Sequence, residues 1–204
     1  MIVRFFIKKE AIFKSLVIIM FVAAASCSSG ASKYNALVKE EMATGTIYDS
    51  LLFGMRFGQS KKEFFDRCWK LNSEGIIKQG PNNKFVEYKL PIKKGQDLQH
   101  AITMLFYGVF NNSNTMTGMD FQFSYDGWSL WNEKLQSHEL IHSVKDSIEK
   151  WYPGNDFVQL RMKNDTSEVY VKIDGNRRIL IKPLDDDRIV KARIDDLRYS
   201  LDKL

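Results

Sequence analysis

A short histidine motif, "HELIH" at residues 138–142, is the stretch of this sequence that points most directly to chemistry. Two histidines four positions apart on a helix share one face and can hold a zinc ion between them. His138 and His142 are therefore candidate metal ligands, and Glu139 is a candidate general base that would activate a zinc-bound water. On this interpretation the protein is a zinc-dependent metallohydrolase.

The helix predicted around this motif, residues 137–152, turns the two histidines away from its apolar face. Five apolar residues cluster around one direction: Leu140, Ile141, Val144, Ile148 and Trp151. At about 100° per residue, His138 lies about 110° and His142 about 150° from the centre of that cluster. The histidines are thus predicted on a solvated side, whereas a catalytic zinc needs a walled site.

A third zinc ligand is also missing from the places where zinc hydrolases carry one. The sixth residue after His142 is Ile148, and the segments that follow resemble strands rather than a second glutamate-bearing helix. His100, the third histidine of the chain, lies far away in sequence. We therefore expect no metal, no cofactor and no catalytic residue, and keep the zinc hydrolase as an alternative.

Three other groups of residues are candidate sites. Trp128 and Trp131 in "WSLW" could stack on a sugar, which makes a glycan-binding module a further alternative, although tryptophans more often fill a core. Cys68 shares one predicted helical face with Phe64, Phe65 and Trp69, which indicates a buried, inert thiol. The acids at 185–187 lack the spacing of a calcium loop and are typical of a solvated turn.

The first 26 residues have the pattern of a secretory signal peptide. Four basic residues and one acid precede an apolar run of 10 residues, 16–25. A helix needs about 20 apolar residues to span a bilayer, so this run is too short to remain as an anchor.

The residues that follow the apolar run resemble a bacterial lipobox. "AASC" ends at Cys27. Cleavage before this cysteine would expose it for acylation by chains such as palmitate. Ala24 stands at the position where the motif favours leucine. Ordinary cleavage one residue earlier would instead leave a spare thiol. We predict a lipidated Cys27 on a polar tether within 27–50, and Ser28 favours sorting to the outer membrane.

The charge of the chain owes much to this leader. The whole sequence has 30 basic and 25 acidic residues, and removing the four and one of the leader leaves 26 and 24, a net charge of +2. A nearly neutral domain with scattered lysines gives no reason to expect nucleic acid as a partner.

Residues 51–204 are predicted to form one α+β domain. "SKKE" at 60–63 is a helix capping box, Gly75 marks the exit of that helix, and the second helix covers 137–152. "NNSNT" and "DGN" are typical of hairpin loops. The strands are expected at 51–57, 84–91, 100–110, 117–125, 156–162, 167–173, 177–183 and 188–195.

These elements predict two helices packed on one face of an antiparallel sheet. The residues between the tether and the sheet, "YNALVKEEM", are compatible with a short helix or with loose chain. A helix precedes a run of strands twice along the chain. We therefore add the hypothesis that the domain consists of two tandem halves, 51–131 and 132–204, each a helix followed by a meander.

The stretch "FGMRFGQSKKEFFDRC", residues 53–68, resembles the SmpA/OmlA type of small outer-membrane lipoprotein. The resemblance lies in Gly54, Met55, Ser60, Glu63 and Phe64 and covers only this part of the chain, and "LNSEGII" stands where that family has Gly-x-Pro. The wider fold group includes the tandem-repeat β-lactamase inhibitor proteins. The resemblance implies an envelope-assembly or inhibitor-like binding role without catalysis.

We therefore expect a bacterial cell-envelope lipoprotein whose domain is a non-catalytic protein-binding or envelope-assembly module. Its partners would be the membrane, through the lipid anchor, and a protein of the envelope. An exposed face or edge of the sheet would be the docking surface.

Overall fold

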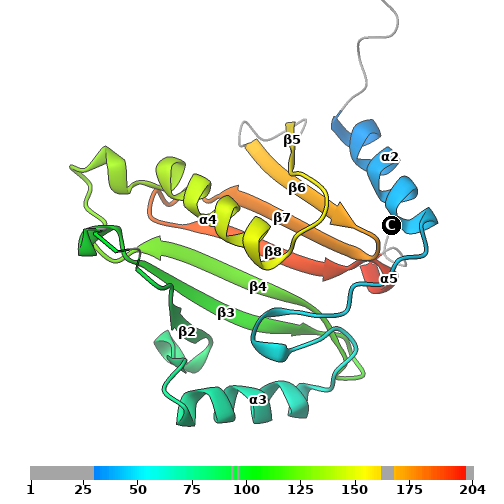
Figure 1. Ribbon diagram of the computed structural model, residues 1–204, viewed down its shortest axis with the longest axis horizontal. Coiled ribbons are helices and arrows are strands. Elements are labelled where there is room, and N and C mark those ends of the chain that lie inside the picture. The colour runs from blue at the N-terminus through cyan, green and yellow to red at the C-terminus, as the bar shows by residue number, and fades with distance from the viewer. Residues whose placement is uncertain (1–29, 93, 96, 162–167, 201–204) are drawn as a thin grey trace, which may run out of the picture.

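The structure of the protein, a computed structural model, describes residues 30–92, 94–95, 97–161 and 168–200 (Figure 1). The predicted signal peptide and Cys27 lie outside the described residues. The described chain has four α-helices: α2 (Gly30–Ala43), α3 (Lys61–Ser73), α4 (Ser137–Trp151) and α5 (Leu197–Ser200). Its eight strands are β1 (Lys78–Gln79), β2 (Val86–Lys89), β3 (Ile102–Phe110), β4 (Met116–Tyr125), β5 (Val158–Arg161), β6 (Glu168–Asp174), β7 (Arg177–Pro183) and β8 (Val190–Asp196).

All eight strands form one antiparallel sheet in the order β1-β2-β3-β4-β8-β7-β6-β5. Each half of the chain supplies a four-stranded meander that runs from an edge towards the centre. The two meanders meet where β4 pairs with β8, from Gly118 opposite Asp195 to Phe123 opposite Val190 (Figure 1). The predicted α+β class with an antiparallel sheet is confirmed.

Short-range sequence signals account for the hairpins. Asp174 pairs with Arg177, which leaves Gly175 and Asn176 as a two-residue loop, and Gly175 takes the positive φ of 52° that such loops favour. In β3 the buried residues alternate with half-exposed ones, as expected for a strand with one face on a core. The β3–β4 and β6–β7 hairpins are therefore as predicted.

The capping box of α3 is also as predicted. Ser60 Oγ accepts a hydrogen bond from the Glu63 backbone N–H at 3.2 Å, and the Glu63 carboxylate accepts one from the Ser60 backbone N–H at 2.7 Å. The prediction of its apolar face is wrong in part, because Phe65 and Trp69 are exposed. They lie one position past Phe64 and Cys68, which is enough to turn them about 100° away from the core.

The expected packing of two helices on one face is not confirmed. α4 crosses the sheet over β4, β7 and β8, whereas α3 contacts β3 and lies beyond the β2–β3 side of the sheet (Figure 1). The segment left open between helix and loose chain forms α2, whose Val38 packs with Val171 and Ile173 in a second core cluster. Lys172 lies between those two residues in β6, so its side chain is on the other face of the sheet. It pairs with Ile179 of the main core, and α2 therefore covers the face opposite the main core.

The strand predicted at 51–57 is wrong. Residues Leu52–Gly54 form a 3-10 turn with Phe53 at φ 61°. Among the described residues, the segment makes one isolated bridge, between Ser50 and Arg56. Its apolar residues Leu51, Met55 and Phe57 are buried in the main core. They cover the sheet beside α4 instead of extending it (Figure 1).

Candidate functional site

The histidine motif lies on the solvent side of α4. His138 and His142 are both exposed, and the Nε2 atom of His138 is 3.9 Å from a carboxylate oxygen of Glu139. Within the described ranges, no group of three or more His, Cys, Asp and Glu side chains could hold a metal ion. The two imidazoles share a helix face, but no third donor among the described residues lies with them, and Glu139 is exposed as well.

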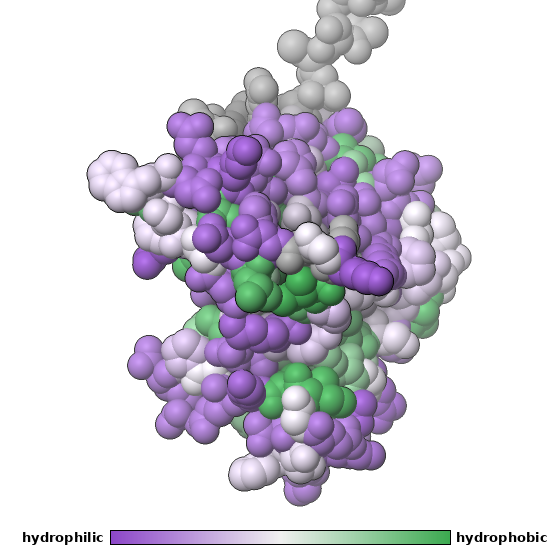
Figure 2. Space-filling view, turned by 60° about the vertical axis from the view of Figure 1, so that its left-hand side comes forward, coloured by the Kyte–Doolittle hydropathy of each residue, from purple (hydrophilic) through white to green (hydrophobic). Residues whose placement is uncertain are grey.

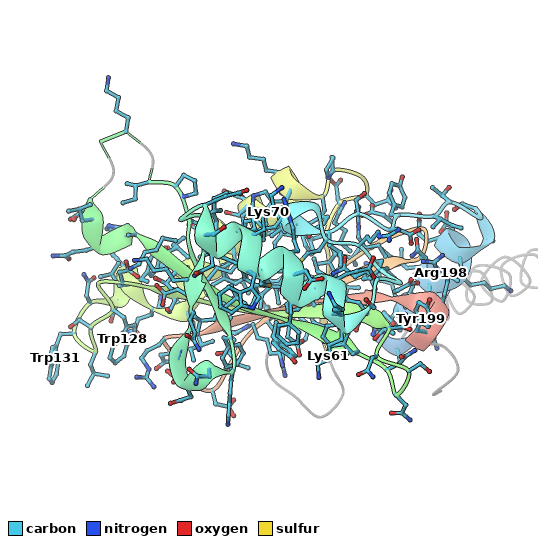
Figure 3. The ribbon with its side chains drawn as sticks, turned by 90° about the horizontal axis from the view of Figure 1, so that it is seen from below. Lys61, Lys70, Trp128, Trp131, Arg198 and Tyr199 are labelled. Carbon is cyan, nitrogen blue, oxygen red and sulfur yellow. The ribbon has the colours of Figure 1, made fainter. Side chains whose placement is uncertain are left out.

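The two tryptophans of "WSLW" have different environments. The indole N–H of Trp128 donates to Gln136 Oε1 at 3.3 Å, and the Arg188 guanidinium lies 5.4 Å from its ring centre. Trp131 is 89 % exposed at the end of the same loop (Figure 3). The first ring is engaged in packing, so only Trp131 is fully available to an external ligand.

The structure shows the surroundings of Cys68 and of the acidic turn 185–187. Cys68 is buried, and this burial raises the pKa of its thiol to about 11, which fits an inert thiol. In the turn 185–187, Asp186 binds Arg188 through Nε at 2.8 Å and Nη2 at 2.6 Å. These hydrogen bonds lower the pKa of Asp186 to about 2, as expected for a carboxylate with a guanidinium partner.

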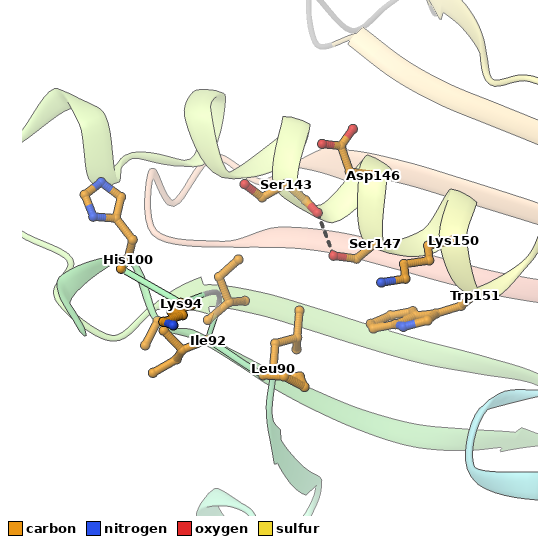
Figure 4. A pocket seen from close by; sticks show the side chains of 13 residues that line it. Leu90, Ile92, Lys94, His100, Ser143, Asp146, Ser147, Lys150 and Trp151 are labelled. Atoms are coloured by element: carbon orange, nitrogen blue, oxygen red, sulfur yellow. Dashed lines mark hydrogen bonds between the residues drawn. The ribbon is translucent and has the colours of Figure 1, made fainter. Parts of the chain in front are cut away.

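A groove of about 680 Å³ opens between α4 and the described residues of the segment 90–102, and no sequence pattern predicts it (Figure 4). Its floor is apolar, with Leu90, Ile92, Ile102 and Trp151, and lysines 94 and 150 lie on its two sides. Figure 2, which brings the left-hand side of Figure 1 forward, shows a hollowed face where hydrophobic surface is bordered by hydrophilic residues. The groove forms because α4 covers the β4–β8 part of the sheet and leaves the start of β3 open.

The α4 side of this groove is held in place by local contacts. Ser147 Oγ donates to the Ser143 carbonyl oxygen at 2.8 Å, and the Trp151 ring stacks on Phe123 with centroids 6.5 Å apart. Lys150 extends over Trp151 towards the groove, while Asp146 points away from its floor (Figure 4). The site therefore combines apolar surface with cationic rather than anionic groups.

A second surface is the face of the sheet opposite α4. The strand registers align Leu105 with Gln122, Gln122 with Lys191, and Lys191 with Lys182, while Tyr107 aligns with Asp120 and Asp120 with Arg193. All of these side chains are only partly buried. Within the described chain, α2 packs on this face over β5 and β6, and Leu180 of β7 and Leu197 of α5 belong to the same cluster. The face therefore stays open from β3 to β8 and at the Lys182 end of β7.

The charges on this open face are incompletely balanced. Asp120 Oδ1 lies 3.5 Å from Arg193 and 4.0 Å from Lys191. Lys182 is directly opposite Lys191, and like charges in that position repel each other. An acidic group on a partner would relieve this repulsion.

No helix in the described part of the chain has the length and hydrophobicity needed to cross a membrane. No protein-family model matches the chain, and neither curated proteins nor solved structures give a match. The resemblance to SmpA/OmlA lipoproteins and to tandem-repeat inhibitors therefore stays a prediction from one stretch of sequence.

Proposed function

We propose that this protein is a bacterial cell-envelope lipoprotein that binds another envelope protein and carries out no catalysis. Cys27 would carry the acyl chains, and the leader before it would be removed. Each buried methylene of an acyl chain contributes about 0.8 kcal/mol, so several chains hold a domain firmly at a membrane. The residue after the anchor, Ser28, supports an outer-membrane location.

The observation that carries the binding role is the open face of the sheet. Leu105 supplies apolar surface there, and Tyr107, whose ring also packs against Phe64 with centroids 5.8 Å apart, lies at its edge. Arg193 lies two strands away in the same row as Tyr107. Tyrosine and arginine are enriched in protein interfaces because they combine large contact area with directional polar groups. The repulsion between Lys182 and Lys191 favours a partner that presents acidic side chains.

The order of elements supports the finer fold proposal. α3 precedes the meander β1–β4, α4 precedes the meander β5–β8, and the two meanders join through β4 and β8. We propose that the two tandem halves, 51–131 and 132–204, are equivalent units that share one sheet. This organisation is also what the resemblance to tandem-repeat inhibitor proteins implies.

The anchor is tested by a Cys27→Ser variant of the full chain. We expect the wild-type protein in the membrane fraction with a mass increase on Cys27, and the variant in the soluble fraction. If the variant stays with the membranes, the anchor is not this cysteine.

The docking face is tested by a photo-crosslinking amino acid placed at Gln122, with His142 on the solvent side of α4 as the matched control position. In living cells, position 122 should give one discrete crosslinked envelope protein, and position 142 should not. The further change Lys182→Glu, at a half-exposed lysine opposite Lys191, should abolish the crosslink while leaving the circular-dichroism spectrum unchanged. A crosslink from position 142 alone, or one that is insensitive to Lys182→Glu, would reject the open face as the docking surface.

A further inference from the structure

We propose that the groove between α4 and the segment 90–102 binds a single-chain amphiphile with an anionic head group, such as a fatty acid. This site is separate from the open sheet face and goes beyond the proposed function. It is assigned from the size of the groove, its lining and its uncompensated charge.

The size and the floor of the groove suit an acyl chain. Its volume of about 680 Å³ lies within the range of roughly 300–1,000 Å³ that small-molecule sites occupy. Leu90, Ile92, Ile102 and Trp151 reach the floor from three different parts of the fold. Ile92 is 46 % exposed, so covering it with a methylene chain removes apolar surface from water.

The charges at the groove select an anion. Lys94 and Lys150 are exposed on opposite sides of it, and neither makes an ion pair or hydrogen bond with another described residue. Asp146, the acid that lines the groove, directs its carboxylate away from the floor (Figure 4). An anionic head group would therefore meet a lysine at the rim while its chain lies on the apolar floor.

A peptide fits this groove less well because the walls offer no free strand edge. Residues 103–106 of β3 are paired with β2 on one side and with β4 on the other. The Leu90 N–H already donates to the Ile102 carbonyl oxygen at 2.9 Å. Extended peptides gain much of their affinity from such backbone bonds, whereas an acyl chain needs only apolar contact.

The test uses the full-length chain in bacterial membranes and three photoreactive probes. The probes are palmitic acid, lysophosphatidylglycerol and hexadecanol, each with a diazirine in its alkyl chain. We expect at least one of the two anionic probes to label peptides that contain residues 90–102 or 143–151, and hexadecanol to label them about tenfold less. Labelling by palmitic acid identifies a carboxylate ligand, and labelling by the lysolipid alone identifies a phosphate head group.

Two variants decide between specific binding and proximity to the membrane. Lys150→Glu should lower labelling by the anionic probe about tenfold, and Ile92→Asp should do the same, while Lys39→Glu on α2 should leave it unchanged. Both altered side chains are exposed, and circular dichroism checks that the variants fold. Equal labelling by hexadecanol, labelling unchanged in Lys150→Glu, or labelling outside the groove would overturn the proposal. The Gln122 crosslink does not involve the groove. Failure of the lipid-labelling test would therefore leave the proposed docking face untouched, and failure of the crosslink would leave the groove proposal untouched.

Discussion

The hydroxyl oxygen of Tyr152 accepts a hydrogen bond of 3.0 Å from the backbone N–H of Leu52, 100 positions earlier in the chain. Tyr152 ends α4, and Leu52 begins the turn that replaces the strand expected at 51–57. The Arg177 guanidinium lies 4.8 Å from the ring centre of Tyr152 and 4.8 Å from that of Tyr48, so it joins the two rings. The segment before α3 is thus fastened to the second half of the sheet.

Replacing Tyr152 with phenylalanine should destabilise the protein by about 1–3 kcal/mol. The ring and its stacking on Arg177 would be retained, but the Leu52 N–H would lose its partner in a partly buried place. Urea unfolding followed by circular dichroism measures the change. Tyr199→Phe, at an exposed tyrosine, is the control and should change the free energy of unfolding by no more than about 0.5 kcal/mol. Equal effects of the two changes would contradict this role of Tyr152.

Asp174→Asn should be far more damaging than removal of a surface acid. The Asp174 carboxylate is buried and accepts from Lys172 Nζ at 3.2 Å, Arg177 Nη2 at 3.0 Å and the Asn155 backbone N–H at 2.8 Å. Its neutralisation leaves two buried cations without their anion, which costs about 3–5 kcal/mol. Asp186→Asn removes an exposed pair with Arg188 and should cost at most about 1 kcal/mol in the same unfolding experiment. A similar midpoint for the two variants would show that the buried cluster is dispensable.

The capping box of α3 should give stability that depends on pH. The hydrogen bond from the Ser60 backbone N–H, with a smaller contribution from its hydroxyl, lowers the pKa of Glu63 below its usual 4.5. A lowered pKa in the folded state means that the stabilisation is complete above 4.5 and is lost as the pH falls through the folded value.

Glu63→Gln is the matched variant, because glutamine can keep the capping geometry but does not titrate. We expect the melting temperature of the wild type to exceed that of Glu63→Gln at pH 7, and the difference to shrink towards pH 3. Glu74→Gln, outside the capping box, serves as the control. A difference that stays constant over this pH range would show that the Glu63 charge contributes nothing to the cap.

The histidine motif should not hold stoichiometric zinc. His138 and His142 are exposed, and two imidazoles without a third protein ligand bind the metal only weakly. Elemental analysis of the purified full-length protein after dialysis should give much less than one zinc per chain, and His142→Ala should not change it. One tightly held zinc that disappears in His142→Ala would instead support the metallohydrolase.

Features controlled by nearby residues could be read from the sequence. The Ser60–Glu63 cap, the loop at Gly175 and Asn176, and the outward direction of the histidines all depend on contacts within a few residues. The apolar positions of β3 and α4 were likewise set by the periods of a strand and a helix. The α+β class and the solvated histidines followed from these local rules.

The two surfaces proposed as binding sites depend on contacts between distant parts of the chain. Leu51, Met55 and Phe57 have an apolar pattern typical of a strand, but they pack into the main core as a covering segment. The hydrogen bond from Leu52 to Tyr152 holds this segment in place. The meeting of β4 with β8 determined which strands share the open face, and the position of α4 left the groove beside Lys150. Periodicity tells which side of an element is apolar. Which other element packs against that apolar side is decided only in the folded structure, because the packing depends on the free energy of the whole core.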